Sequence, residues 1–132
     1  MSPHRHIVQE FLDCLARADF DALFELVDPE VTWRIPGRDE FHHRDDVRKA
    51  VFGRFPTLFD GPLRIELDEV VEDGEIVFAR AHGGARIRGG GEYRNRYAFF
   101  CRIRDGKIVE LEEFFDSARA LTDLAGKKLI DA

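Results

Sequence analysis

The fold of this chain is decided by residues 92–116, EYRNRYAFFCRIRDGKIVELEEFFD. The dipeptide Asp105-Gly106 predicts a tight turn between two strands, because Gly tolerates positive φ and Asp-Gly favours hairpins. In each strand the odd-numbered face is mainly apolar and carries a few isolated polar groups, and Glu113 is the only carboxylate on it. Alternate residues of a strand share one face. The pattern therefore predicts the wall of a cavity that contains Glu113.

The rest of the chain supplies helices first and strands afterwards. Apolar periodicity predicts a helix over 4–18, a second one capped by Asp19 and ended by Asp28-Pro29, a short strand over 31–35, and a third helix over about 45–59 that Pro56 kinks or ends. Residues 63–73 and 75–87 predict a second hairpin, turned at Asp73-Gly74. A short closing helix and a tail, about 127–132, complete the chain. This order predicts an α+β fold with helices packed on one face of an antiparallel sheet.

Composition limits the classes of protein that fit. The length of 132 residues suits a single domain over 1–132, and the net charge of −6 argues against nucleic acid and anionic membranes as partners. No apolar run is long enough to span a membrane, and the N-terminal stretch has no signal-peptide core, so we expect a cytoplasmic protein. Cys14 and Cys101 lack metal-ligand spacing and are expected to be buried free thiols.

These features resemble a known superfamily. The order of helices, Pro-Gly strand and long hairpins is similar to the cone fold of nuclear transport factor 2. The stretch NRYAFFCRIRDGKIVELEEFFD, together with ADFDALFELVDPEVTW, resembles the SnoaL-like branch of that superfamily, beside ketosteroid isomerase. The resemblance implies a strongly bent sheet wrapped around the N-terminal helices, with an internal pocket and a homodimeric assembly. It leaves the activity open, because the superfamily includes isomerases, cyclases, dehydratases, epoxide hydrolases and non-catalytic modules.

Ketosteroid isomerase activity is not expected. That enzyme uses an Asp base with an oxyanion hole made of a Tyr and a protonated Asp. An ungapped alignment places the Tyr on Phe11, the base on Ile35 and the protonated Asp on Phe99, so all three polar groups are replaced by apolar ones.

Other polar residues are candidates for chemistry in the pocket. Glu113 or Asp116 is the candidate general base, since SnoaL-type cyclases carry an acid/base carboxylate near the position of Asp116. His82 is the candidate partner acid, and Tyr97 or Asn95 the candidate oxyanion donor. We expect a largely buried Glu113 with a perturbed pKa, in an elongated cavity whose mouth lies near Trp33 and the His42-His43 loop. The candidate substrate-binding residues are Trp33, Phe11, Phe78, Asn95, Phe99, Leu111 and Phe115.

Several of these residues also have purely structural interpretations. Glu113 can instead pair with Arg80 or Arg96, His82 can be a satisfied core histidine, and Tyr97 can be a packing aromatic. Asp116 can simply cap the closing helix that begins at Ser117. No cofactor is expected. A metal at His42-His43 is not expected either, because adjacent histidines on a strand point in opposite directions and no second carboxylate accompanies them.

Two functions therefore stay open. The first is a small cofactor-independent enzyme that performs cyclisation, isomerisation or dehydration on a hydrophobic small molecule, as a SnoaL-like cyclase, isomerase or lyase. The second is a non-catalytic ligand-binding or dimerisation module. The sequence does not identify the substrate. Three large apolar side chains on the outer sheet face, Phe100, Ile108 and Phe114, predict a homodimer through that face.

Overall fold

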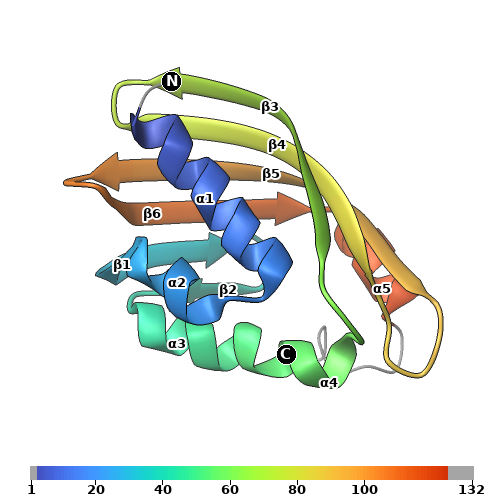
Figure 1. Cartoon of the computed structure of the whole chain (residues 1–132). Coiled ribbons are helices and arrows are strands. Elements are labelled where there is room, and N and C mark those ends of the chain that lie inside the picture. The colour runs from blue at the N-terminus through green and yellow to red at the C-terminus, as the bar shows by residue number, and fades with distance from the viewer. Residues whose placement is uncertain (1–2, 125–132) are drawn as a thin grey trace.

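The computed structural model describes residues 3–124 and arranges them as one curved sheet with helices on its concave side (Figure 1). The predicted tail at 127–132 lies outside the described residues. In chain order the elements are α1 (Pro3–Arg17), α2 (Phe20–Glu25), β1 (Val27–Ile35), β2 (Asp39–Phe41), α3 (Arg44–Ala50), the 3-10 turn η1 (Phe52–Arg54), α4 (Phe55–Leu58), β3 (Arg64–Asp73), β4 (Ile76–Arg86), β5 (Glu92–Arg104), β6 (Lys107–Phe115) and α5 (Ser117–Asp123).

The predicted α+β fold is confirmed. The sheet has the order β2-β1-β6-β5-β4-β3 and does not close, so β2 and β3 form its edges. Strands β3 to β6 are successive antiparallel hairpins, whereas β1 pairs with β6 in parallel. The parallel pairing sets Trp33 beside Leu111, so Trp33 and Glu113 come to one face of neighbouring strands.

The turn at residues 105–106 has the geometry that its sequence predicts. Asp105 has φ +52 and Gly106 has φ +75, and two successive positive φ values define the type I′ turn that suits the twist of paired strands. The turn after Asp73 likewise contains Gly74 at φ +59.

The core lies between α1 and the concave face of the sheet. Val8, Phe11 and Leu12 of α1 are almost fully buried, as are Phe99 and Ile103 of β5 and Leu111 of β6. Cys14 and Cys101 are both buried and free, as predicted. Asp19 caps α2, because its side chain accepts from the backbone N–H of Ala22.

Three predictions about local structure are wrong. The helix predicted over about 45–59 is broken into α3, η1 and α4, and it leaves the α-helical path at Val51, before Pro56. Strand β1 begins at Val27 rather than at residue 31. Ile108 does not lie on the outer face. The register shifts between Arg102 and Ile103, and this bulge turns Ile108 into the core, where it is fully buried.

The predicted facing of β4 is also wrong, and this affects the site. Val77, Ala79 and Ala81 are buried on the concave face, whereas Phe78 and His82 are exposed on the outer face. Cross-strand partners share a face, and Phe78 pairs with Phe100 while Ala79 pairs with Phe99. Helix α1 contacts β4, so the inner face of this strand carries small side chains beneath the helix.

Candidate active site on the concave face of the sheet

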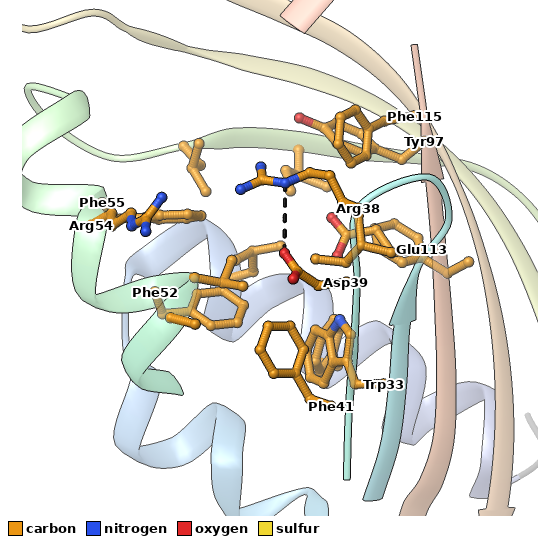
Figure 2. Close-up of a pocket in the computed structure, with 18 of the residues that line it drawn as sticks. Trp33, Arg38, Asp39, Phe41, Phe52, Arg54, Phe55, Tyr97, Glu113 and Phe115 are labelled. Atoms are coloured by element: carbon orange, nitrogen blue, oxygen red, sulfur yellow. Dashed lines mark ion pairs between the residues drawn. The ribbon is translucent and has the colours of Figure 1, made fainter. Parts of the chain in front are cut away.

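A cavity of about 260 Å³ lies between the concave face of the sheet and the helices. Seven of the twelve phenylalanines line it, so its wall is mainly aromatic. Figure 2 shows that the helical side supplies Phe52, Arg54 and Phe55, and the strand side supplies Trp33, Phe41, Tyr97, Glu113 and Phe115. Arg38, from the turn between β1 and β2, and Asp39, the first residue of β2, extend into the space between these two sides.

Glu113 is the central ionisable group of this cavity. Desolvation by the surrounding wall raises its pKa from an ordinary value of 4.5 to about 7, because burial penalises the charged carboxylate. The indole N–H of Trp33 and the positive charge of Arg38 act in the opposite direction. Glu113 is partly accessible, and it also lines a second hollow beside Pro36 and Ser117. A carboxyl group in this state exchanges its proton close to neutral pH.

Trp33 and Arg38 lie near Glu113 and favour its ionised form, although neither holds it in a hydrogen bond of ordinary geometry. Nε1 of Trp33 and Nε of Arg38 are both buried, and neither has a hydrogen-bond partner among the described residues. The Arg38 guanidinium makes one loose ion pair, with Nε 3.7 Å from a carboxylate oxygen of Asp39. This distance is longer than a hydrogen bond.

A pair of tyrosines forms the neighbouring part of the wall. The hydroxyl oxygens of Tyr93 and Tyr97 lie 3.3 Å apart, and the side-chain amide of Asn95 donates to the Tyr93 hydroxyl at 2.8 Å. Burial raises the pKa of both tyrosines, so both stay protonated at neutral pH. Their mutual hydrogen bond uses one of the two hydroxyl protons. The other proton can be donated to a molecule in the cavity.

The structure brings six of the predicted residues into the cavity wall. These are Glu113, Tyr97, Trp33, Phe11, Phe99 and Phe115. Leu111 is fully buried in the core beneath the cavity. Asn95 is buried as well, but its amide is occupied by the Tyr93 hydroxyl and by the backbone of Arg96 and Asp116, so it positions Tyr93 instead of facing the cavity.

Three other predicted site residues lie elsewhere. His82 and Phe78 are on the outer face, where His82 Nδ1 lies 2.9 Å from the Asp68 carboxylate. Asp116 caps α5 by accepting from the backbone N–H of Arg119 at 3.0 Å, which is the structural interpretation considered above. The geometry gives neither His82 nor Asp116 a contact with the cavity that Glu113 lines.

The alternative in which Glu113 pairs with Arg80 or Arg96 is also wrong. Arg80 pairs with Glu69 at 2.9 Å, and both arginines lie exposed on the outer face of the sheet. Burial of Glu113 is therefore not offset by either of them.

Sequence analysis missed four polar residues of the cavity, namely Arg38, Asp39, Arg54 and Tyr93. Tyr93 shares the odd-numbered face of β5 with Tyr97, so the alternation already contained this signal. Arg38 and Asp39 follow Pro36-Gly37, where Gly37 has φ +81 and turns the chain back over the cavity. The predicted mouth near Trp33 is occupied by this turn, while His43 caps α3 and His42 pairs with Glu40.

Within residues 3–124, no three His, Cys, Asp or Glu side chains come together as metal ligands would. In the same range, every helix is too short or too polar to cross a membrane.

Known structures share this architecture. An NTF2-like protein of unknown function from Burkholderia pseudomallei has a TM-score of 0.85 and 22% identity, over 96% of this chain and 100% of its own. TerC co-crystallised with polyporic acid has a TM-score of 0.80 and 19% identity, covering 93% and 98% of the two chains. An LEH-like epoxide hydrolase from M. tuberculosis has a TM-score of 0.78 and 16% identity, covering 92% and 89%.

The fold is therefore NTF2-like. Within that class, the chain belongs to the SnoaL-like domain family, whose model matches residues 8–111. This confirms the resemblance deduced from the sequence. Among curated proteins, no sequence matches the chain.

Proposed function

We propose that this protein is a small cofactor-independent enzyme that moves protons on a hydrophobic small molecule bound in the concave cavity, with Glu113 as general base. The observation that carries the proposal is the Glu113 carboxyl in a mainly aromatic wall, with a pKa of about 7. A general base is most effective when its pKa is near the working pH. The family setting supports a catalytic or binding role at this level, and the epoxide hydrolase and TerC structures show enzymatic and ligand-bound members of the same fold.

The proposed step is the transfer of a proton from an acidic C–H of the ligand to the ionised Glu113 carboxylate. The C–H electron pair stays on the ligand, and the proton then returns to another atom of it. Cyclisation, isomerisation and dehydration all begin with such a transfer. A protonated tyrosine of the Tyr93–Tyr97 pair supports the step by donating to the ligand.

The alternative is a ligand-binding module without chemistry. A collapsed cavity is expected if the module only dimerises, and a Glu113 neutralised by Arg80 is expected in a module of either kind that performs no chemistry. The cavity has a volume of about 260 Å³, and Arg80 is paired with Glu69 on the other face. The open cavity favours a ligand-binding role over dimerisation alone, and the absence of an Arg80 pair at Glu113 favours acid/base chemistry over passive binding.

Deuterium exchange on a simple cyclic ketone tests the proposal. The probe is 2-tetralone in D₂O, whose acidic C1 hydrogens are followed by proton NMR. We expect the protein to accelerate this exchange, with a rate that rises about tenfold per pH unit below pH 7 and levels off above it, because only ionised Glu113 accepts a proton. Glu113→Gln should reduce the acceleration by at least about 100-fold.

Glu112→Gln is the matched control, since Glu112 is the adjacent residue of β6 and is absent from the cavity wall. It should leave the exchange rate within about twofold of the natural protein. The proposed function is contradicted if Glu113→Gln keeps the acceleration. It is also contradicted if the natural protein exchanges the probe no faster than buffer alone does.

We also propose that the protein forms a homodimer through the outer face of the sheet. Phe78 and Phe114 are 43% and 41% exposed there, and Phe100 lies beside Phe78. Apolar groups of this size on one face indicate an interaction surface. Light scattering at micromolar concentration should give twice the monomer mass. A monomer mass contradicts the dimer and leaves the proposed chemistry unaffected.

A further inference from the structure

Two buried donors in the cavity make no hydrogen bond of ordinary geometry with another described residue. Among the described residues, the buried side-chain nitrogen and oxygen atoms without a hydrogen bond are Trp33 Nε1 and Arg38 Nε, and both residues line the same cavity. Trp33 is only 1% exposed, so bulk water does not compensate its indole N–H. Leaving a buried donor unpaired is unfavourable, and native structures do so rarely. Because both donors lie in the wall of one cavity, a ligand bound there can supply the acceptor that each of them lacks.

The surroundings define what that partner must be. Trp33 Nε1 can only donate, and so can the Arg38 guanidinium, which is also always charged. The groups that these donors face must therefore be acceptors, and a negatively charged acceptor is favoured by the charge of Arg38. Asp39 does not occupy this role, because it is 3.7 Å from Arg38 Nε and its side chain is 40% exposed.

Both donors also lie where charge moves during proton transfer. Trp33 and Arg38 each favour the ionised form of Glu113, so both are close to its carboxylate. When Glu113 accepts a proton it loses its charge, and an equal negative charge appears on the ligand. In Figure 2 the indole nitrogen of Trp33 faces the part of the cavity that contains Glu113, Arg38 and Asp39. The same two donors can therefore follow the charge from Glu113 to the ligand.

We propose that Trp33 Nε1 and Arg38 Nε hold one oxygen atom of the ligand, a carbonyl oxygen that becomes an enolate oxygen when Glu113 removes a neighbouring proton. This inference rests on the proposed function and assigns its substrate class, an apolar ketone or related carbonyl compound. It also gives Trp33 and Arg38 a role in catalysis, because both would touch the reacting group.

A pair of probes with one skeleton isolates the oxygen site. Tetralin has no oxygen, and 2-tetralone has a carbonyl that only accepts hydrogen bonds. Affinities are measured by calorimetry at pH 8, where Glu113 is mainly ionised and cannot donate to the carbonyl. We expect the natural protein to bind 2-tetralone at least about tenfold more tightly than tetralin, which corresponds to one or two hydrogen bonds.

Trp33→Phe and Arg38→Met should each reduce this affinity ratio by about three- to tenfold and leave tetralin binding nearly unchanged. Phe41→Leu is the matched control: it removes part of the apolar wall without removing a donor, so it should weaken both probes together and preserve the ratio. Arg38 lies on a turn, so Arg38→Met tests the inference even if Trp33→Phe impairs folding.

The outcomes separate the two proposals. An affinity ratio that is near one in the natural protein, or that is unchanged in both donor variants, overturns the oxygen site. An intact ratio that responds to both variants supports the oxygen site, even if deuterium exchange shows no catalysis and the proposed function fails. Absence of binding for both probes contradicts the apolar ligand and therefore both proposals.

Discussion

Two glutamates of β6 show how the faces of one sheet differ. Glu110 points outward, where it accepts from Arg34 Nη1 at 2.6 Å and from Arg102 Nε at 3.0 Å, and these hydrogen bonds lower its pKa. Glu113 points inward, where burial raises its pKa to about 7. Residue type and strand are the same, so the face alone decides the protonation state at neutral pH. The outer face uses carboxylates to join strands, whereas the inner face isolates one carboxyl for chemistry.

The largest expected effect is a difference in the free energy of unfolding between substitutions on the inner and the outer face of the sheet. Ile103→Ala removes a fully buried side chain from the inner face and should lower the free energy of unfolding by about 2–5 kcal/mol. Val71→Ala, on an outer position that is 60% exposed, should change it by less than about 0.5 kcal/mol. Urea denaturation of both variants measures the difference. Similar losses for the two would mean that the outer face is as well covered as the core.

The faces of β5 and β6 followed from the sequence because their patterns are long and amphipathic. Alternation from Asn95 to Ile103 correctly set Tyr97 and Phe99 inward, and alternation from Val109 to Phe115 set Glu113 inward as well. Strand β4 was misassigned because its inner face carries Ala79 and Ala81, which are small enough for close packing. Hydrophobicity alone favours the face with Phe78, although that side chain lies outside.

The remaining errors arise from features that alternation does not contain. A bulge near Ile108 shifts the pairing of β6 with β5 by one residue, and the residue types beside the bulge do not signal it in the sequence. Arg38 and Asp39 enter the cavity because the chain turns at Gly37, and the direction of such a turn depends on tertiary packing. The absence of a hydrogen-bond partner for the donors of Trp33 and Arg38 among the described residues likewise depends on the three-dimensional arrangement.

The second prediction is that neutralising Glu113 and neutralising Glu110 change the free energy of unfolding in opposite directions. Because the native pKa of Glu113 lies above its unfolded value, the folded state binds more protons between pH 4.5 and about 7 and loses stability as pH rises through this window. Glu113→Gln removes this penalty and should stabilise the protein at pH 8 by up to about 3 kcal/mol, with little difference at pH 4.5.

Glu110→Gln should act in the opposite direction. A lowered pKa gives stability that is present above the unfolded pKa and is lost as pH falls, so this variant should be less stable at pH 8. Its partly accessible ion pairs limit the loss to about 1 kcal/mol. Thermal melts of both variants from pH 4.5 to 8 measure these trends. Parallel curves for the two would contradict the assignment of Glu113 to a desolvated site.

The third prediction separates a helix cap from a catalyst. Asp116→Ala removes the acceptor of the Arg119 N–H and should cost about 1 kcal/mol of stability, while deuterium exchange on 2-tetralone stays within about twofold. Asp116→Asn is the control, because Asn caps about as well as Asp but carries no charge. If both variants lost exchange activity, Asp116 would have to act on the ligand despite its position outside the cavity wall.

The smallest expected effect concerns His82, which lies on the opposite face of the sheet from Glu113. His82→Gln keeps a polar side chain of similar reach beside Asp68 and removes the imidazole. Exposed pairs of this kind contribute about 0.2–1 kcal/mol, so stability should change by no more than this amount. Exchange on 2-tetralone should stay within about twofold, because two strands carry His82 and Glu113 to different faces and no proton passes directly between them. The rate of His82→Gln is compared with that of Glu113→Gln in one assay. A loss as large as that of Glu113→Gln would show that the two faces are chemically coupled, and the division of the sheet into a structural outer face and a reactive inner face would fail.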